Sequence, residues 1–388
     1  MAKNISVGID IGTQTTRVVV VEYVKGKPVP RILGTGKSES QGLRQGYIHD
    51  YEATIESIKK AVAEAEKNAG VTIKKAFVSI GGISLTSEMG HGYSIISRGD
   101  KEVTELDINK AIHESEDAID ISNKKIIHVI PVTYKLDGNE VLGNPEGMQG
   151  IKLEVKTLFV TAMERHIENL LGALAEAGID VQDVIAAPIA ASMVALTEKQ
   201  KSVGCILIDI GAETVEIAVF ENGTVLSLQV FPIGSMDITN DIALGFKIPL
   251  EDAEKLKRGN IVGEFPKKKL QEIITARATD IFEYVEAHLK KIKRNGLLPA
   301  GVIITGGGSN ILEIEELSKK ILRLPSRKGN ALIFQAKKGS GDASWLVALG
   351  LCVVGRRFYD QDYTQETLSK TFSGIKKFFK SLSKQLLP

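Results

Sequence analysis

The chain has 388 residues, of which 43% are hydrophobic and 25% are charged, the proportions of an ordinary soluble globular protein with room for more than one domain. Its formal net charge of +1 gives no electrostatic argument for nucleic-acid binding. The N-terminus lacks the apolar segment of a signal peptide, and the longest nearly apolar run (Val184–Leu196) is too short to span a bilayer. The scattered histidines make no zinc motif, and the two cysteines are expected to be reduced.

The first element is a β-branched strand that runs into a polar turn. Ile5–Ile11 predicts a buried strand, and Val18–Tyr23 predicts the next strand. The turn between them has a carboxylate at Asp10 and a glycine at Gly12, which lets a ligand approach the backbone. These residues suit a phosphate and its Mg²⁺, although an isolated turn of this kind is more often only a turn.

A second copy of this unit occurs in the second half of the chain. Gly204–Gly211 reads G-C-I-L-I-D-I-G, places Asp209 where the first copy has Asp10, and is followed by a predicted strand at Val215–Phe220. The repetition predicts a duplicated domain. The two turns would then face each other across a cleft and hold one phosphate chain from both sides.

Between the two copies, the pattern predicts a helix at Tyr51–Asn68 and a strand at Lys75–Ile80. The segment from Ile83 to Val160 differs in composition and pattern from the residues before it, and it predicts a small inserted α+β subdomain. Its predicted elements are a Gly- and Ser-rich extended stretch to Arg98, a helix near Leu106–Ile119 with a Thr104–Asp107 capping box, and the strands Lys125–Leu136 and Ile151–Thr161 around the loop Gly138–Gly150.

In the rest of the globular part, helices are predicted on both sides of the second copy of the strand unit. Met163–Ala177 predicts a helix, and the small residues of Val184–Leu196 suit close contact between helices of the two halves. Residues 237–298 are predicted to be helix-rich, with a polar helix start at Thr239–Asp241. Gly301–Asn310 reads as a strand that opens into three glycines at a helix start, where an anion is favoured, and Ala343–Phe358 predicts a final helix.

This order of motifs resembles the actin, sugar-kinase and heat-shock chaperone superfamily and, more narrowly, the FtsA family of bacterial cell-division proteins. The residues that carry the FtsA resemblance are Ala76–Gly82, Ile126–Pro131, Asn144–Gly150 with Leu153–Val155, Thr239–Ala243 and Ile304–Gly308. The resemblance implies an α/β fold: actin-like, duplicated ribonuclease-H-type domains around a nucleotide cleft, an FtsA-type inserted α+β subdomain and a C-terminal amphipathic helix. The expected parts are a first subdomain (1–82, 162–198 and 343–358), the insertion (83–161), a second subdomain (199–236 and 299–342), a helical partner-binding subdomain (237–298), a linker (359–370) and a membrane-targeting helix (371–387).

The resemblance also implies binding of ATP and Mg²⁺, with the metal held through water by Asp10 and Asp209. The residues implied to bind the nucleotide are Asp10, Gly12, Thr13, Gln14, Thr15, Asp209, Gly211, Ala212, Glu213, Thr214, Gly234, Glu254, Lys257, Gly306, Gly307, Gly308 and Ser309. Many relatives have a lysine where this chain has Thr15, so phosphate contact is expected to be weaker. No water-activating base can be named from the sequence, and hydrolysis is expected to be slow at most.

The C-terminal tail has an apolar face opposite a basic face, which is the pattern of a helix that lies in a membrane interface. The apolar face consists of Phe372, Ile375, Phe378, Phe379, Leu382, Leu386 and Leu387, and the basic face of Lys376, Lys377, Lys380 and Lys384. The alternative for such a segment is a terminal helix that packs on the core. The preceding polar stretch and the lysine face favour an anionic membrane surface.

FtsA-family proteins form filaments and tether the tubulin-like protein FtsZ to the membrane, so the resemblance implies a peripheral protein on the cytoplasmic face of the cell membrane at the division septum. The FtsZ C-terminal peptide, which is acidic and apolar, is implied to bind the basic run Lys290, Lys291, Lys293 and Arg294, with Asn295. Other division proteins are expected to bind the inserted subdomain. Two alternatives remain open: a pilus-assembly adaptor of the same superfamily, and a small-molecule kinase of the same fold.

Overall fold

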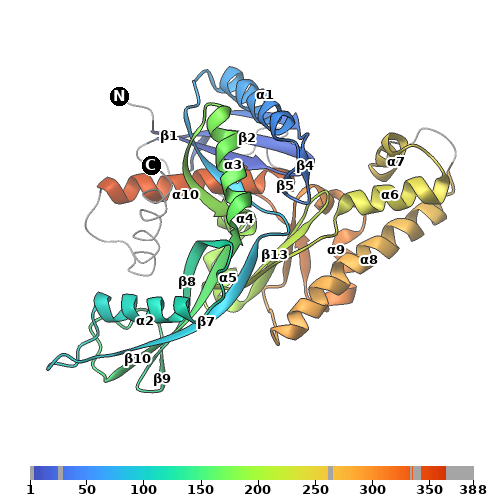
Figure 1. The fold of residues 1–388 in the computed structure, drawn as a ribbon. Coiled ribbons are helices and arrows are strands. Elements are labelled where there is room, and N and C mark those ends of the chain that lie inside the picture. Colours follow the sequence, from blue (N-terminus) through green and yellow to red (C-terminus); the bar gives the residue numbers. More distant parts are fainter. Residues whose placement is uncertain (1–3, 25–28, 261–264, 333, 335–341, 364–388) are drawn as a thin grey trace.

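The computed structural model describes residues 4–24, 29–260, 265–332, 334 and 342–363, and it places a five-stranded sheet at the centre of each of two lobes (Figure 1). The sheet of the first lobe has the order β11-β6-β1-β2-β3, from β1 (Asn4–Ile11), β2 (Thr15–Tyr23), β3 (Arg31–Glu39), β6 (Lys75–Ile80) and β11 (Asp180–Ala186). The sheet of the second lobe has the order β14-β13-β12-β15-β16, from β12 (Cys205–Ile210), β13 (Val215–Glu221), β14 (Thr224–Phe231), β15 (Val302–Thr305) and β16 (Ser326–Lys328).

The two sheets have the same topology. In each, three antiparallel strands that are consecutive in the chain are followed by two parallel strands, and the polar turn joins the first strand to the second. The predicted duplication is therefore confirmed at the level of strand order.

Four helices pack on the first sheet: α1 (Tyr51–Ala69), α3 (Glu164–Glu176), α4 (Ala187–Ala195) and α10 (Leu346–Tyr363). The Asp50 side chain caps α1 by accepting from the backbone N–H of Ala53 at 3.1 Å, and α1 ends at Gly70 with φ 67°. Strand β3 lies so close to α1 that only a glycine fits at position 36. A Cβ there would lie 2.0 Å from the Ala61 carbonyl oxygen.

Helices α4 and α10 pack against one another near the boundary of the lobes. A Cβ on Gly350 would lie 1.8 Å from the carbonyl oxygen of Ala190, so the contact requires a glycine. The small residues of the Val184–Leu196 run do serve close helix packing, but the partner helix α10 belongs to the first lobe as well, so the contact is not between helices of the two halves as predicted; the first three residues of the run complete β11.

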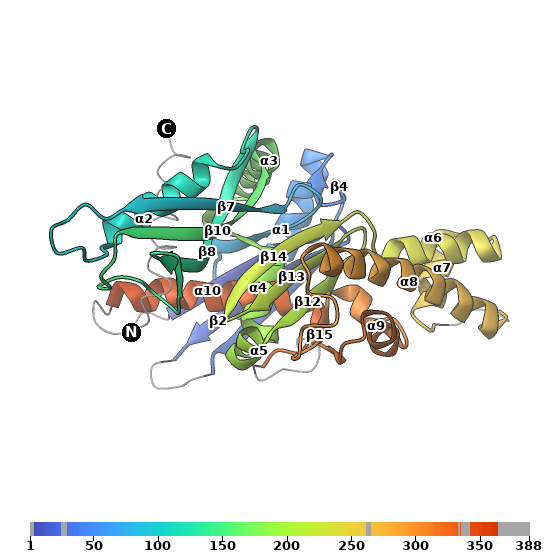
Figure 2. The same ribbon diagram turned by 90° about the horizontal axis from the view of Figure 1, so that it is seen from below.

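The insertion is a four-stranded sheet in the order β7-β10-β8-β9 with one helix on it (Figure 2). Its elements are β7 (Thr86–Ile95), α2 (Glu105–Asp117), β8 (Lys124–Leu136), β9 (Asn139–Val141) and β10 (Lys152–Met163). The predicted capping box forms, since the Thr104 backbone N–H donates to Asp107 at 3.0 Å. Gly90 and Gly92 of β7 lie against α2, as the glycines of β3 lie against α1.

Helices α6 (Ser235–Phe246), α7 (Leu250–Lys257) and α8 (Lys267–Lys291) project from the second lobe, and α9 (Ile314–Leu322) follows β15. Two predictions were wrong here. Helix α6 begins at Ser235 rather than at Thr239, because Asp237 accepts from the Gly234 N–H and so caps the earlier start. The three glycines open into a single 3-10 turn, Gly307–Asn310, and not into an α-helix.

The shorter elements are the hairpin β4 (Leu43–Arg44) and β5 (Tyr47–Ile48), the helix α5 (Glu198–Val203) and the 3-10 turn Ala343–Trp345. Helix α10 continues to Tyr363, five residues beyond the predicted end, into the stretch expected to be a linker. The predicted membrane helix 371–387 lies outside the described residues. Within the described ranges, no helix combines the length and the apolar character needed to cross a membrane.

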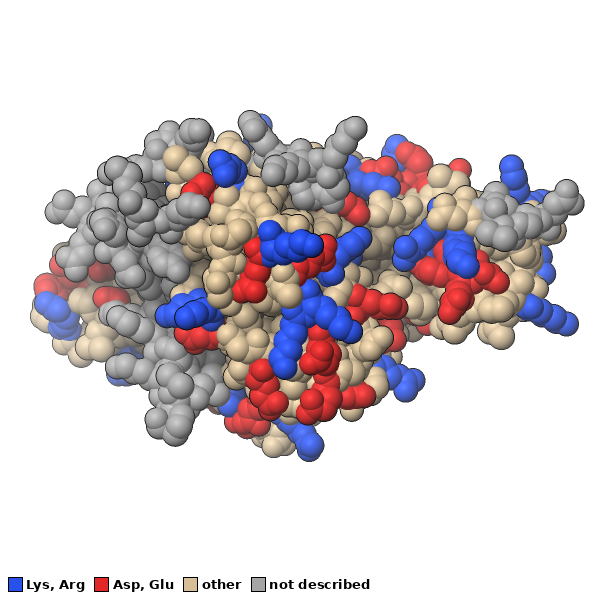
Figure 3. Space-filling model, turned by 90° about the horizontal axis from the view of Figure 1, so that it is seen from above, with Lys and Arg blue, Asp and Glu red and all other residues tan. Residues whose placement is uncertain are grey.

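Acidic and basic side chains are interspersed over the face seen from above, with no continuous area of one sign (Figure 3). A mixed face of this kind generates no strong electrostatic field.

Candidate functional site

A cavity of about 570 Å³ lies where the two polar turns meet. Of the predicted nucleotide-binding residues, those that line it are Asp10, Gly12, Thr13, Gln14, Thr15, Asp209, Gly211, Ala212, Thr214, Glu254, Lys257, Gly306, Gly307 and Gly308. These residues come from segments far apart in the sequence, and the fold brings them to one place.

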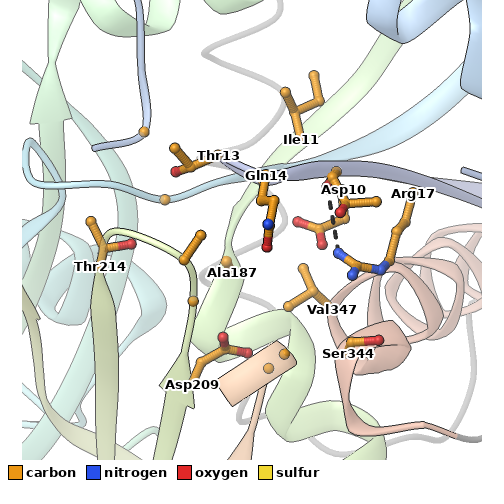
Figure 4. Close-up of a pocket in the computed structure, with 18 of the residues that line it drawn as sticks. Asp10, Ile11, Thr13, Gln14, Arg17, Ala187, Asp209, Thr214, Ser344 and Val347 are labelled. Carbon is orange, nitrogen blue, oxygen red and sulfur yellow. Dashed lines mark hydrogen bonds between the residues drawn. The ribbon is translucent and has the colours of Figure 1, made fainter. Parts of the chain in front are cut away.

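Asp10 and Asp209 point toward one another across this cavity (Figure 4). Ser79 donates its hydroxyl to Asp10 at 2.8 Å, and Thr305 donates to Asp209 at 2.9 Å. Burial raises the pKa of Asp10, and burial together with the charge of Asp10 raises the pKa of Asp209 to about 6. Asp10 is buried and Asp209 half-buried, and two such carboxylates that repel one another fit a divalent cation, because a bound cation would stabilise both in the ionised form.

Gly306, the residue after β15, lets the backbone of its turn lie directly against Asp209. Gly306 has a φ of 81°, and a Cβ there would lie 2.5 Å from a carboxylate oxygen of Asp209. A side chain at this position would therefore collide with Asp209. The close backbone approach at Gly306 is to Asp209 and Ile210, and the helix that starts at these glycines is a short 3-10 turn; anion binding there stays a prediction.

Glu254 and Lys257 form a bonded network at another wall of the cavity. The Lys257 ammonium lies 2.6 Å from the Glu254 carboxylate and also donates to the Thr239 hydroxyl at 2.8 Å. Arg258 forms a second ion pair with Glu254 at 2.7 Å. Lys257 is one turn after Glu254 on α7, so the helix brings both to the same face, and the network fixes a carboxylate and an ammonium group at the cavity surface.

Three predicted nucleotide-binding residues do not line the cavity. Ser309 is buried and donates its hydroxyl to the Gly306 carbonyl at 2.7 Å, which fixes the glycine turn. Gly234 lets α6 begin against the second turn, because a Cβ there would lie 2.3 Å from the Ala212 carbonyl oxygen. Glu213 accepts from the backbone N–H of Gln45 in the other lobe.

Arg17 lines the cavity and was missed by the sequence reasoning. Its guanidinium lies 5.8 Å from the centre of the Trp345 ring and donates to the Thr15 carbonyl. Arg17 brings a cation to the cavity wall two residues after Thr15 along β2, and the weaker phosphate contact expected from Thr15 stays a prediction. Alternation along the strand places residues 15 and 17 on the same face and could have identified it.

Glu216 is a second residue that was missed. It lines the cavity on β13, and burial raises its pKa to about 8, although a hydrogen bond from the Gly82 backbone acts in the opposite direction. One of its carboxylate oxygens has no hydrogen-bond partner among the described residues. A buried carboxyl group with a raised pKa at a cavity wall is a candidate for proton transfer or water positioning.

The basic run near the end of α8 is only partly available for a partner. Arg294 makes a forked ion pair with Glu221, with distances of 2.8 and 3.1 Å, and Lys290 pairs with Glu286 at 2.8 Å. Lys291 and Lys293 are exposed. The hydrogen bond from Lys290 lowers the pKa of Glu286, and the charges of Lys290 and Arg323 act in the same direction.

The two lobes, the shared cleft and the two opposed Asp turns define a protein of the actin-like class. The fold is similar to that of the PilM–PilN type IV pilus biogenesis complex, with a TM-score of 0.69, 20% sequence identity, and coverage of 90% of this chain and 98% of that chain. It is also similar to MreB5 of Spiroplasma citri bound to ADP, with a TM-score of 0.53, 13% identity, and coverage of 93% and 99%. At these identities the likeness establishes the fold alone.

Sequence comparison identifies the family within this class. Residues 206–350 match the family described as "Cell division protein FtsA", and residues 82–161 match "SHS2 domain inserted in FTSA". FtsA of Pseudomonas aeruginosa is 31% identical over 345 residues, covering 83% of this chain and 82% of that protein; FtsA of Bacillus subtilis strain 168 is 31% identical over 340 residues, covering 82% and 76%. The chain belongs to the FtsA family of cell-division proteins.

Proposed function

We propose that this chain is an ATP-binding protein that forms actin-like filaments and anchors FtsZ to the cytoplasmic face of the cell membrane, where it helps to assemble the division septum. The observation that carries the nucleotide part is the position of Asp10 and Asp209, two carboxylates that face one another across the cavity between the lobes. Membership of the FtsA family supports the proposed filament formation, FtsZ binding and membrane attachment.

The residues that line the cavity can be assigned to the metal, the phosphates and the ribose of Mg²⁺–ATP. Asp10 and Asp209 would hold the metal through water, Thr13, Gln14 and the second turn would contact the phosphates, and Glu254 with Lys257 would bind the ribose. Bound Mg²⁺ would offset the charge of the phosphates and of both carboxylates. Arg17 supplies a further cation on the phosphate side, and any hydrolysis is expected to be slow.

Trp345 gives a direct test of nucleotide binding. The chain has a single tryptophan, it lines the cavity, and its ring lies under the Arg17 guanidinium. ATP with Mg²⁺ is expected to draw Arg17 toward the phosphates and so to change the tryptophan fluorescence in a saturable way, with a smaller response in Arg17→Ala. Fluorescence that stays constant while calorimetry also detects no heat of binding would contradict the proposed nucleotide function.

The FtsZ peptide is proposed to bind beside the exposed end of α8. Reversing Lys291 and Lys293 to Glu is expected to weaken binding of the acidic peptide by roughly tenfold at low salt, because both side chains are exposed and their charges attract the peptide. Arg294 is unsuitable for this test, since its reversal would also break the ion pair with Glu221. Fluorescence anisotropy of a labelled peptide measures the change.

The matched control reverses Lys59 and Lys60, an exposed pair on α1 in the first lobe, and should leave peptide affinity unchanged. Equal affinities for the wild type and both variants would rule out this surface. The subdomain limits expected from the sequence, and binding of other division proteins at the insertion, belong to the same proposal. The pilus-adaptor alternative shares the fold, but the sequence relatives described above are FtsA proteins.

A further inference from the structure

The side chain of Glu213 points away from the cavity, although both of its neighbours in the chain line it. Ala212 and Thr214, on either side of it in the second turn, both face the cavity. The Glu213 carboxylate instead accepts the backbone N–H of Gln45, in the first lobe, at 2.5 Å. A hydrogen bond to a carboxylate is among the stronger ones, and this one joins the two lobes beside the phosphate-side wall of the cleft.

The turn that carries Glu213 is fixed to its own lobe. The backbone N–H groups of Ser235 and Met236, at the start of α6, donate to the carbonyls of Gly211 and Ala212 at 2.9 and 2.7 Å. Any movement of the second lobe therefore moves Glu213 with it.

The donor lies on a turn that is equally well fixed. Gln45 and Gly46 form the two-residue loop of the β4–β5 hairpin, with φ values of 50° and 86°, both in the region that such tight hairpin loops use. The Ile83 N–H donates to the Gln45 carbonyl at 3.2 Å, and a Cβ on Gly46 would lie 2.4 Å from the Cα of Gly82.

His166 of α3 holds the same hairpin from the other side. Its ring hydrogen-bonds the Gly46 backbone and lies 2.6 Å from the Ser84 hydroxyl, and the Tyr47 ring packs on it at 4.8 Å. With its carbonyl and its neighbours held within the first lobe, the Gln45 N–H is presented to the second lobe.

A second contact crosses between the lobes close to the first. The Gly82 N–H donates to the Glu216 carboxylate at 2.7 Å, and Glu216 is three residues after Glu213 on the same hairpin of the second lobe. Both crossings join a carboxylate of the second lobe to a backbone N–H of the first. Because the two donors are backbone groups fixed within the first lobe, both contacts form together only over a narrow range of relative positions of the lobes.

We propose that Glu213 is a positioning residue that latches the second phosphate turn to the β4–β5 hairpin and so holds the two lobes at the spacing that a bound nucleoside triphosphate requires. This inference rests on the proposed nucleotide function. Loss of the latch lets the cleft open more often, and an open cleft releases its ligand from one of the two turns. The expected effect is therefore mainly on the rate of nucleotide release.

The test measures the dissociation constant and dissociation rate of a fluorescent ATP analogue with Mg²⁺ on the full chain. Glu213→Ala should bind about tenfold more weakly, the loss expected for one hydrogen bond to a charged group, mostly through faster release. Glu213→Gln keeps an acceptor oxygen at the same reach and should restore most of the affinity, whereas Glu213→Asp is one methylene shorter and should resemble Glu213→Ala.

Gln45→Gly is the matched control, because the donor is the backbone and glycine tolerates a φ of 50°; it should bind like the wild type. Thermal unfolding of each variant without nucleotide checks that the fold is retained. Wild-type affinity in Glu213→Ala, or equal losses in Glu213→Ala and Glu213→Gln, would overturn the latch while leaving nucleotide binding intact. A wild-type chain that binds no analogue would overturn both the latch and the proposed function.

Discussion

Replacing Asp209 with Asn is expected to weaken binding of Mg²⁺–ATP by about 100-fold, which corresponds to about 2.8 kcal/mol at 1.4 kcal/mol per tenfold change. The substitution keeps the size of the side chain and an oxygen that can accept from Thr305, so the fold should be retained. It removes one of the two charges that would hold the metal, and a metal on phosphate contributes several kcal/mol of charge stabilisation. Titration with ATP, in the presence and absence of Mg²⁺, measures the effect.

The loss should be confined to the metal-dependent part of the affinity, so that ATP in the presence of a chelator binds the variant and the wild type equally. Asp183→Asn is the matched control. Asp183 is half-buried like Asp209, with a pKa that desolvation raises to about 7, but it lies on β11 and not in the lining of the cavity. Equal affinity of Asp209→Asn and wild type for Mg²⁺–ATP would show that this carboxylate does not hold the metal.

Truncation before Phe372 is expected to abolish binding to anionic liposomes. The removed segment carries the apolar residues that would enter the lipid interface, at ~1.5 kcal/mol or more for each large side chain, and lysines that would contribute ~1 kcal/mol each near anionic lipid. Ordering the tail backbone costs ~1–2 kcal/mol per residue, an opposing quantity of comparable size, so one tail should bind only marginally. A filament that presents many tails should bind firmly through avidity.

Liposome flotation of the full chain, with and without conditions that promote polymerisation, measures this effect. A chain whose tail residues 371–387 are scrambled keeps composition and charge but loses the two-faced pattern, and it should also fail to float. Equal flotation of the truncated and full-length chains would refute a membrane role for the tail, and equal flotation of monomer and polymer would refute the avidity argument.

The sequence predicted the duplicated fold and the central pair of the site because both depend on local pattern. Asp10 and Asp209 each follow a β-branched strand and each begin a glycine turn, so their environments could be predicted from neighbours in the chain. The matching strand order of the two sheets follows from the same repetition.

The predictions failed where a side chain's direction depends on a partner far away in the sequence. Glu213 was grouped with the phosphate-binding residues because it lies between Ala212 and Thr214, yet its partner is a backbone N–H more than 160 residues away in the chain. Arg294 appeared free for a partner because Glu221, which holds it, lies at the end of β13, more than 70 residues earlier in the chain. Long-range contacts of this kind leave no signal in the local sequence.

Arg17 and Glu216 show a different reason for failure. Both lie within a few residues of a recognised turn, on strands whose alternation directs them to the cavity, so the pattern did contain the information. The predicted site residues ended at each turn, whereas the inward face of the following strand continues the cavity wall. Helix α6 was placed too late for a related reason, because a glycine cap at Gly234 is weaker as a sequence signal than the polar residues at Thr239–Asp241.

The central claim is that one chain joins FtsZ to the membrane, and flotation of a labelled FtsZ C-terminal peptide with anionic liposomes tests it most directly. The peptide is expected to float when the full chain and Mg²⁺–ATP are present, and to remain at the bottom with the chain truncated before Phe372 or with Lys291 and Lys293 reversed to Glu. A peptide that floats equally with the truncated chain, or that fails to float with the full chain bound to the liposomes, would contradict the claim.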